Sequence, residues 1–258
     1  MKIACLQWDI KGHEQYQENF AVVRSLAEKT AAYQPDLMVL PEMWATDFSE
    51  PQKCAQYKDE ILEFLKTLAK EMSLYVLGGS MAEKKFNRIA NTAPLISPKG
   101  EILARYSKIH LFKGINEDRD FSAGYEVATV PTLIGKLGIA ICYDLRFPEM
   151  FRKMALDGAD VALVPAQFPA PRAHHWETLL RARAIENQFF TVGVNRTGTA
   201  RNLEFFGKSM AVAPNGDIIN MASHKEGALL IELDLNLIRE TRQDICYIND
   251  RKPEAYKL

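Results

Sequence analysis

The sequence has few cysteines, no long apolar run and almost no net charge, and each shortage excludes a class of protein. Its 258 residues include four cysteines, 32 lysines and arginines, and 33 aspartates and glutamates. Since the charges nearly cancel and no basic block occurs, the chain lacks the electrostatic footprint of a nucleic-acid-binding protein. No apolar run approaches the roughly 20 residues that a membrane-spanning helix needs. We therefore expect neither a nucleic-acid partner nor a membrane.

The N-terminus and the cysteines indicate a reducing compartment. Asp9 brings an acidic group into the first residues, which is too early for a secretory signal peptide. Cys5, Cys54, Cys142 and Cys246 are too far apart for a zinc site and too few for a disulfide scaffold. We expect a cytoplasmic chain with reduced thiols, and the question is whether one of these thiols has a special role.

Short apolar runs rich in branched residues alternate with stretches of helical period, which predicts a layered α/β domain. The apolar runs lie at 3–6, 37–40, 74–80, 137–141, 161–165, 189–194 and 228–233, and the helical stretches at about 14–33, 61–69, 148–156 and 174–187. Turn signals at Pro98–Gly100 and Pro214–Asp217 predict two hairpins. The tail from residue 236 to residue 258 has no core period. Because no Pro/Ser/Gly-rich linker divides the chain, we expect one domain over residues 1–258.

Two ionisable residues follow predicted strands. Glu42 comes after the apolar run 37–40, at a position where partial burial raises the pKa of a carboxylate toward that of a useful base. Taken alone, such a residue is more often an exposed turn glutamate. Lys108 follows the strand-like run 101–107 and, near a carboxylate, can stabilise a developing oxyanion. Its ordinary alternative is a solvated surface lysine.

Cys142 is the thiol whose context differs from the others. It ends the apolar run 137–141 and precedes the helix expected from about Pro148. A strand-to-helix turn presents its side chain at the sheet edge, where backbone N–H groups can bind an oxyanion and nearby positive charge stabilises a thiolate. A buried structural cysteine is the alternative, and it suits Cys5 better. Cys142 is therefore the candidate nucleophile.

Other catalytic motifs are incomplete. Ser80 lacks the closing glycine of a serine-hydrolase turn, and Gly207–Ser209 lacks the first glycine of a phosphate loop, where Asn202 stands. His174 and His175 lack the spacing of two metal ligands on one helix face. We interpret them as capping residues or as neighbours of the site.

Together these segments resemble the nitrilase superfamily of carbon–nitrogen hydrolases over nearly the whole chain. Pro41–Glu42, Lys108–Phe112 and Ile141–Glu149 look like the three signatures of the Glu–Lys–Cys triad of that family, in the same order. Glu117 resembles its second glutamate. The resemblance implies a four-layer α-β-β-α sandwich and a homodimer in which the C-terminal tail, here from about residue 236, crosses to the partner.

The resemblance also implies a hydrolase that acts on a small-molecule amide through a thioester and needs no metal or organic cofactor. Glu42 takes the proton of the Cys142 thiol, the thiolate attacks the amide carbonyl, and Lys108 with the Tyr143 backbone N–H holds the oxyanion. After ammonia leaves, Glu42 activates the water that hydrolyses the thioester. Glu117 orients the amine, the water or Lys108.

Two further residues are candidates for binding the substrate. Arg146, four residues after the nucleophile, is a forked cation suited to a substrate carboxylate. A salt bridge with Glu149 or Glu186 is an equally good interpretation. Phe168 follows the apolar run 161–165 and is expected to close the pocket over the acyl chain, with plain core packing as the alternative.

The choice among activities rests on fewer residues. Pro41–Trp44 and Pro169–Trp176 resemble the bacterial ω-amidase branch, whose substrates are 2-oxoglutaramate and 2-oxosuccinamate. The same triad also supports N-carbamoyl hydrolysis, amidase activity on deaminated glutathione, and nitrile hydrolysis. A catalytically idle interaction protein with the same fold is a third possibility, but it gives no reason to keep Glu42, Lys108 and Cys142 together.

Overall fold

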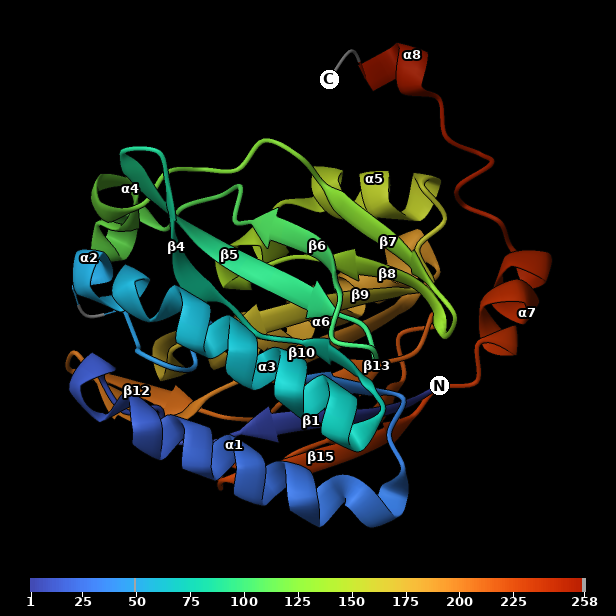
Figure 1. The fold of residues 1–258 in the computed structure, drawn as a ribbon. Coiled ribbons are helices and arrows are strands. Elements are labelled where there is room, and N and C mark those ends of the chain that lie inside the picture. The colour runs from blue at the N-terminus through green and yellow to red at the C-terminus, as the bar shows by residue number, and fades with distance from the viewer. Residues whose placement is uncertain (49, 257–258) are drawn as a thin grey trace.

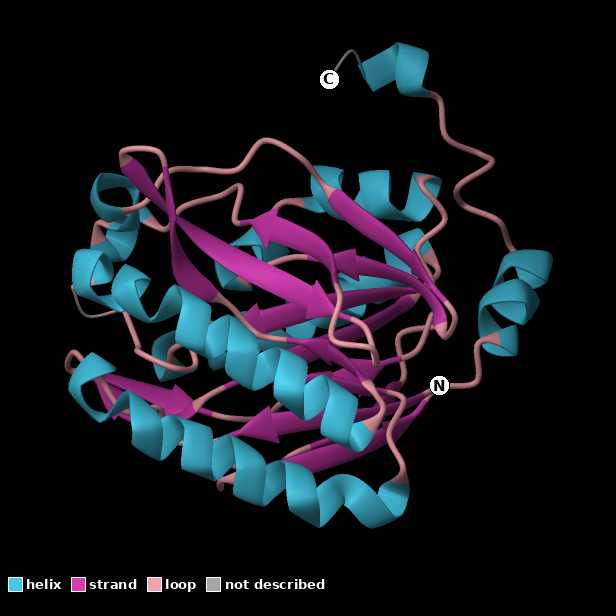
Figure 2. Ribbon diagram, viewed as in Figure 1, coloured by secondary structure: helices cyan, strands magenta, loops and turns pink. Residues whose placement is uncertain are grey.

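Two β-sheets pack face to face, and helices cover the outer face of each sheet (Figures 1 and 2). The computed structural model describes residues 1–48 and 50–256. The predicted four-layer α-β-β-α sandwich is confirmed. The first sheet has the strand order β15 (Gly227–Glu232), β1 (Lys2–Gln7), β2 (Leu37–Val39), β3 (Tyr75–Leu77), β5 (Arg88–Ile96) and β4 (Met81–Lys85), with β6 (Ile102–Ser107) also paired to β5.

The second sheet has six strands, and a separate hairpin accompanies it. The order in the sheet is β14 (Ile218–Met221), β13 (Met210–Val212), β10 (Phe190–Asn195), β9 (Val161–Ala166), β8 (Gly135–Ile139) and β7 (Ala128–Thr132). The hairpin pairs β11 (Thr197–Ala200) with β12 (Leu203–Phe206). Its Phe205 reaches Pro169 through an isolated bridge, which places the hairpin beside the segment that follows β9.

Four long helices form the outer layers. The helices α1 (Tyr16–Thr30) and α3 (Lys58–Met72) cover the first sheet, and α5 (Pro148–Leu156) and α6 (Ala173–Asn187) cover the second. The remaining helices are α2 (Pro51–Cys54), α4 (Glu117–Asp120), α7 (Asn236–Asp244) and α8 (Pro253–Tyr256). No helix in the described part of the chain is long and apolar enough to cross a bilayer.

The central strands are apolar at every position because both faces of the sheet are covered. In β2, Leu37 and Val39 face the second sheet, whereas Met38 packs under α1 and α3. In β1, Cys5 lies between the sheets in the same layer as Leu37. Strands covered on both faces need apolar side chains at every position, so their sequences read as continuous runs.

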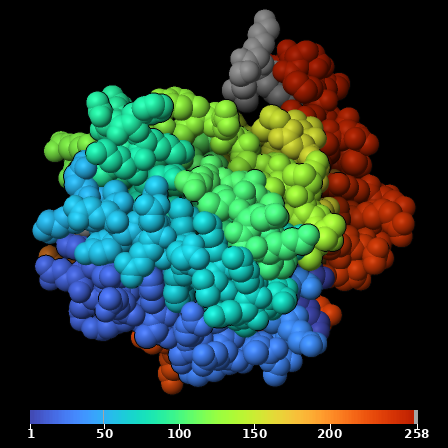
Figure 3. Space-filling model, in the orientation of Figure 1, coloured from blue at the N-terminus to red at the C-terminus, as the bar shows by residue number. Residues whose placement is uncertain are grey.

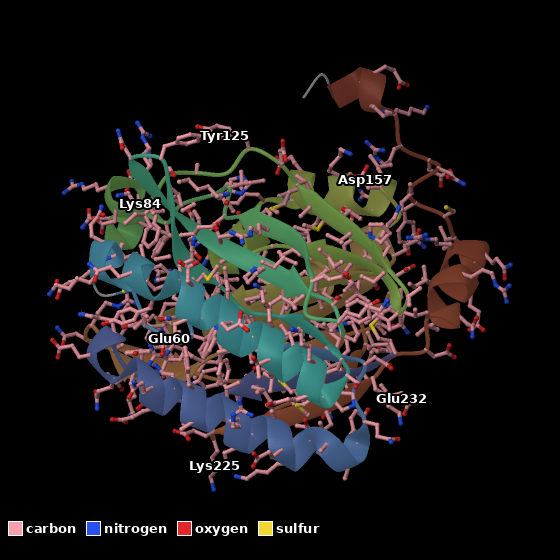
Figure 4. The ribbon with its side chains drawn as sticks, in the orientation of Figure 1. Glu60, Lys84, Tyr125, Asp157, Lys225 and Glu232 are labelled. Atoms are coloured by element: carbon pink, nitrogen blue, oxygen red, sulfur yellow. The ribbon has the colours of Figure 1, made fainter. Side chains whose placement is uncertain are left out.

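The outer surface is polar, as the labelled side chains in Figure 4 illustrate. Glu60 on α3, Lys84 on β4 and Asp157 after α5 point away from the body. In the space-filling view the C-terminal segment forms a ridge along one side of the molecule (Figure 3). The apolar residues are thus concentrated in the layers between the sheets and under the helices.

Both predicted hairpins are present, as β5–β6 and β13–β14. Three hairpins that were not predicted also occur: β4–β5, β7–β8 and β11–β12. Residues 236–244 of the tail form α7, a helix that was not predicted from the sequence. Its buried residue is Ile238, and a single buried residue gives no core period.

Candidate active site

Three of the predicted residues meet where strands of the two sheets end. Glu42 comes shortly after β2, Lys108 directly after β6, and Cys142 three residues after β8. Glu42 and Lys108 therefore come from the first sheet and Cys142 from the second, and the layer between the sheets brings them together. Glu42 and Lys108 are each 1% exposed, so solvent hardly screens their charges.

The Lys108 ammonium lies between two carboxylates. Its Nζ is 2.9 Å from Glu42 Oε1 and lies 2.9 and 2.8 Å from the two carboxylate oxygens of Glu117. The Asn91 amide donates to Glu42 Oε1 at 3.0 Å and to Glu117 Oε1 at 3.2 Å. The two acids thus share both donors. One buried cation between two carboxylates leaves a net negative charge at this point, which favours binding of a proton.

Glu117 is held in place by its own loop. It is the first residue of α4, directly after Asn116 in the left-handed region with φ 59°. The Phe112 N–H donates to Glu117 Oε2 at 2.7 Å, so the chain before α4 folds back onto the carboxylate. Lys108, one of the partners suggested by the sequence, is in direct contact with Glu117.

Cys142 lies in a strained turn. Its φ is 46°, a left-handed conformation that is costly for a residue other than glycine. The buried Asp144 carboxylate holds the turn, since Oδ2 accepts a backbone N–H of the turn at 2.9 Å and the Tyr106 hydroxyl at 2.6 Å. Its Oδ1 accepts the His110 N–H at 3.0 Å. Because Tyr106 and His110 lie on either side of Lys108, Asp144 ties the lysine segment to the cysteine turn.

Burial and charge set the protonation of the site. Burial raises the pKa of Glu42, with Lys108 opposing the rise and Glu117 adding to it. Burial also raises the pKa of the Cys142 thiol well above its usual value, and the charge of Glu42 adds to that rise. Burial alone would lower the pKa of Lys108, but the charges of Glu117 and Glu42 outweigh it and raise the pKa. The resting site therefore holds a protonated thiol beside a basic carboxylate, rather than a preformed thiolate.

A cleft of about 500 Å³, including its open mouth, leads to Cys142. Its lining includes the ionisable groups described above, five aromatic residues and three arginines. The aromatic residues are Phe48, Phe112, Tyr143, Phe168 and Phe205, and the arginines are Arg146, Arg172 and Arg201.

Both predicted substrate-binding residues line this cleft. The Arg146 guanidinium lies over the Phe168 ring, 5.4 Å from its centre. In residues 1–48 and 50–256, neither Glu149 nor Glu186 pairs with Arg146, and Glu186 pairs instead with a neighbour on α6. Phe168 is buried and also packs against Trp176, with ring centres 5.3 Å apart. It is therefore both a wall of the cleft and part of the core.

Three site residues were missed from the sequence: Asn91, Gln167 and Asp144. The Gln167 backbone N–H donates to Glu42 Oε2 at 3.0 Å, and its side-chain amide donates to the Glu42 carbonyl at 3.0 Å. Gln167 directly follows β9, and this position after a strand is the signal that identified Lys108. Asn91 is a buried polar residue inside the apolar strand β5, which is also a usable signal.

The two adjacent histidines lie near the cleft but do not cap α6. His175 Nδ1 is 3.3 Å from an Arg146 nitrogen. The residue at the start of α6 makes no side-chain capping hydrogen bond. Among the described residues, no three histidine, cysteine or acidic side chains are grouped as ligands for a metal ion.

The family model of the carbon–nitrogen hydrolases matches residues 2–243. A 2-oxoglutaramate amidase of Bacillus subtilis is 35% identical over 257 residues, covering 98% of each chain. A deaminated glutathione amidase of Dictyostelium discoideum is 31% identical, covering 94% of this chain and 91% of its own. The crystal structure of a carbon–nitrogen hydrolase from Helicobacter pylori superimposes with a TM-score of 0.94 at 26% identity, over 100% of this chain and 97% of the other.

Proposed function

Because the chain belongs to the carbon–nitrogen hydrolases of the nitrilase superfamily, which cleave C–N bonds other than peptide bonds, we propose that it hydrolyses the ω-amides of small 2-oxo acids. The substrates would be 2-oxoglutaramate and 2-oxosuccinamate, and the products the 2-oxo diacid and ammonia. The observation that supports this most is a thiol, a base and a buried cation in one cleft that is also lined by arginines, two of which have no carboxylate partner in the described part of the chain. The curated relative from Bacillus subtilis carries the name of the same activity.

In the first step Glu42 takes the thiol proton as Cys142 Sγ attacks the amide carbonyl. The raised pKa of Glu42 makes it a stronger base than an ordinary carboxylate, and the raised pKa of Cys142 means that the proton must be removed during attack. The carbonyl oxygen becomes an oxyanion. The backbone N–H of Tyr143, the residue after the nucleophile, is one donor to that oxygen.

Lys108 is the second donor, and the proton transfer itself frees it. In the resting site all three of its contacts go to carboxylate oxygens. Once Glu42 is protonated, its attraction for the ammonium weakens, and one N–H of Lys108 becomes available to the oxyanion. Glu117 keeps the ammonium in place during this exchange, which gives the second glutamate a defined role.

The tetrahedral intermediate then collapses. The C–N bond breaks, the amide nitrogen takes the proton from Glu42, and ammonia leaves a thioester on Cys142. Glu42, ionised again, removes a proton from water, which attacks the thioester and releases the acid. The proton returns to the thiol, so atoms and charges balance over the cycle.

A substrate panel tests this proposal. Ammonia release is measured with 2-oxoglutaramate, glutamine, a carbamoyl amino acid, deaminated glutathione and a nitrile, for the wild type beside Cys142→Ala. We expect the highest kcat/KM with 2-oxoglutaramate and no turnover by the variant. If glutamine is hydrolysed as fast as 2-oxoglutaramate, the 2-oxo acid assignment is wrong. If Cys142→Ala keeps its activity, the thioester mechanism is wrong.

A further inference from the structure

Two arginines of the cleft have no acidic partner. Arg146 belongs to the nucleophile turn, and Arg172 ends the short 3₁₀ turn that leads into α6. In the described part of the chain neither guanidinium pairs with a carboxylate. Arg201, the third arginine of the cleft, is different, because it lies 3.5 Å from a carboxylate oxygen of Asp47 and 3.3 Å from the side-chain oxygen of Gln167.

The guanidinium groups of Arg146 and Arg172 both stack on aromatic rings. Arg146 lies 5.7 Å from the ring centre of Tyr143, in addition to its contact with Phe168, and Arg172 lies 5.4 Å from the ring centre of Phe112. Such stacking engages the flat face of a guanidinium and leaves its N–H edge free for hydrogen bonds. The two guanidinium groups are thus held at the cleft without a carboxylate partner in the described residues.

His175 contacts Arg146 and lies near Arg172 in the chain. Its Nδ1 is 3.3 Å from an Arg146 nitrogen, and it follows Arg172 by three residues, about one helical turn. The pKa of His175 is lowered by partial burial and by the positive charges of His174, Arg146 and Arg172. A neutral imidazole accepts a hydrogen bond at Nδ1. The N-terminus of α6, which begins directly after Arg172, adds further positive potential.

Arg146 is already the candidate for binding the substrate carboxylate, and we propose that Arg172 joins it in binding the 2-oxo acid end of the substrate and that His175 positions Arg146. This inference rests on the proposed function. Two neighbouring cations repel each other unless an anion lies between them, so the missing partner is an anionic ligand. A 2-oxo acid offers three acceptor oxygens in a row, which suits two forks better than one. A 2-amino acid amide would instead bring an ammonium group toward two cations and be rejected.

The kinetic test uses Arg172→Gln with three amides: 2-oxoglutaramate, glutamine and butyramide, which has no charge. We expect kcat/KM for 2-oxoglutaramate to fall about 10- to 100-fold, as for loss of a charge-assisted hydrogen bond. The ratio of kcat/KM for 2-oxoglutaramate to that for glutamine should fall as well. Butyramide hydrolysis should hardly change. Arg181→Gln, on α6 and outside the cleft, is the matched control and should leave all three rates unchanged. An equal loss for butyramide and 2-oxoglutaramate would overturn the inference.

A binding test separates this inference from the proposed function. Binding of 2-oxoglutarate to Cys142→Ala is measured by calorimetry, alone and with Arg146→Gln or Arg172→Gln added. We expect Kd to rise at least about tenfold with either addition. If the wild type does not hydrolyse 2-oxoglutaramate but both additions weaken 2-oxoglutarate binding, only the proposed function fails. If hydrolysis is normal and binding is unaffected by the Arg172 change, only the arginine pair fails.

The positioning role of His175 is tested by removing or replacing the acceptor atom Nδ1 that faces Arg146. In His175→Asn the amide oxygen can occupy the position of Nδ1, whereas His175→Leu has no acceptor. We expect KM for 2-oxoglutaramate to rise in the leucine variant with little change in kcat, and the asparagine variant to restore KM. Melting temperatures close to that of the wild type exclude a folding defect. A fall in kcat without a rise in KM, or no rescue by asparagine, would contradict the positioning role.

Discussion

At the scale of single residues, the four cysteines show how the surroundings decide what a thiol does. Cys5 lies between the sheets, and burial raises its pKa far above the usual value. Burial raises the pKa of Cys54 to about 11. Cys142 is also desolvated, but it lies beside a base and a cation and opens onto the cleft. Cys142 can therefore pass its proton to Glu42 while it attacks an amide carbonyl.

Replacement of the base should separate thiol reactivity from hydrolysis. Glu42→Gln removes a negative charge that raises the pKa of Cys142, so the thiolate fraction at neutral pH should increase. We expect alkylation of Cys142 by iodoacetamide to be several-fold faster in this variant, as the thiolate is the reacting form, while amide hydrolysis is lost. Mass spectrometry of the labelled peptides measures both Cys142 and the half-exposed Cys246, which serves as the internal reference. Slower labelling of Cys142 relative to Cys246 would contradict this reasoning.

The pH dependence of kcat/KM is also expected to follow from the ionisation of Glu42. The pKa of Glu42 is raised, and the base must be ionised, so kcat/KM should fall as the pH falls through that raised value. The acid limb should therefore have its midpoint above about 4.3, the usual glutamate pKa. The raised pKa of Lys108 keeps its ammonium charged throughout this range. The measurement is a pH profile of kcat/KM, with the exposed Glu149→Gln as a control that should leave it unchanged. A midpoint at or below the usual value would disprove the assignment.

At the scale of secondary-structure elements, the segment that carries Glu42 depends on a close backbone approach. Gly79 follows β3 with φ 55°, and a side chain there would overlap the Pro41 carbonyl oxygen. Gly100, in the β5–β6 turn, also has a positive φ, of 77°, but a side chain there would meet only the flexible end of Lys70. The two glycines share a conformation and differ in what surrounds them.

Alanine substitutions at these two positions should therefore have unequal effects. Both variants bear the cost of a left-handed alanine, about 1 kcal/mol. Gly79→Ala also displaces the backbone next to Glu42, so we expect a total loss of about 3 kcal/mol in the free energy of unfolding and at least a tenfold loss of kcat/KM. Gly100→Ala should retain full activity. Urea unfolding and steady-state kinetics measure the two effects, and equal losses in both variants would refute the explanation.

The place of a residue relative to a strand decided whether its role could be predicted from the sequence. Glu42 and Cys142 were found because each follows an apolar run that forms a central strand. Asp144 was not, since its importance comes from contacts with residues distant in the chain: it accepts hydrogen bonds from Tyr106 and His110, 38 and 34 positions away. The β7–β8 hairpin escaped notice for a local reason. Its turn begins with an exposed leucine and an isoleucine, which carry no turn signal.

At the scale of the whole molecule, hydrogen bonds at the site join the two sheets, and both sheets contribute residues to it. Asp144 from the second sheet accepts hydrogen bonds from the segment around Lys108 of the first sheet. Gln167, after β9 of the second sheet, donates to Glu42 of the first. Separation of the two layers would therefore dismantle the site, which supports our proposal that residues 1–258 form a single domain. The C-terminal segment is the exception, since it projects beyond this sandwich (Figure 1).

That projecting segment leads us to predict a homodimer. The helix α8 has four residues and lies apart from the body, and so short a helix is not stable without a packing partner. Backbone groups of Ile245 and Tyr247 bond to Gln188 at the end of α6, while their side chains remain 52% and 41% exposed. Contact with a second copy would bury these side chains.

Light scattering after size exclusion should give twice the chain mass of 29.2 kDa for the wild type. Ile245→Ser combined with Tyr247→Ser should raise the dimer dissociation constant at least about tenfold, because the interface loses two apolar side chains. Phe86→Ser, which replaces a 98% exposed residue at the distant β4–β5 turn, is the control and should leave the mass unchanged. A monomeric wild type, or equal dissociation constants for the double variant and the control, would show that the segment does not pair two chains.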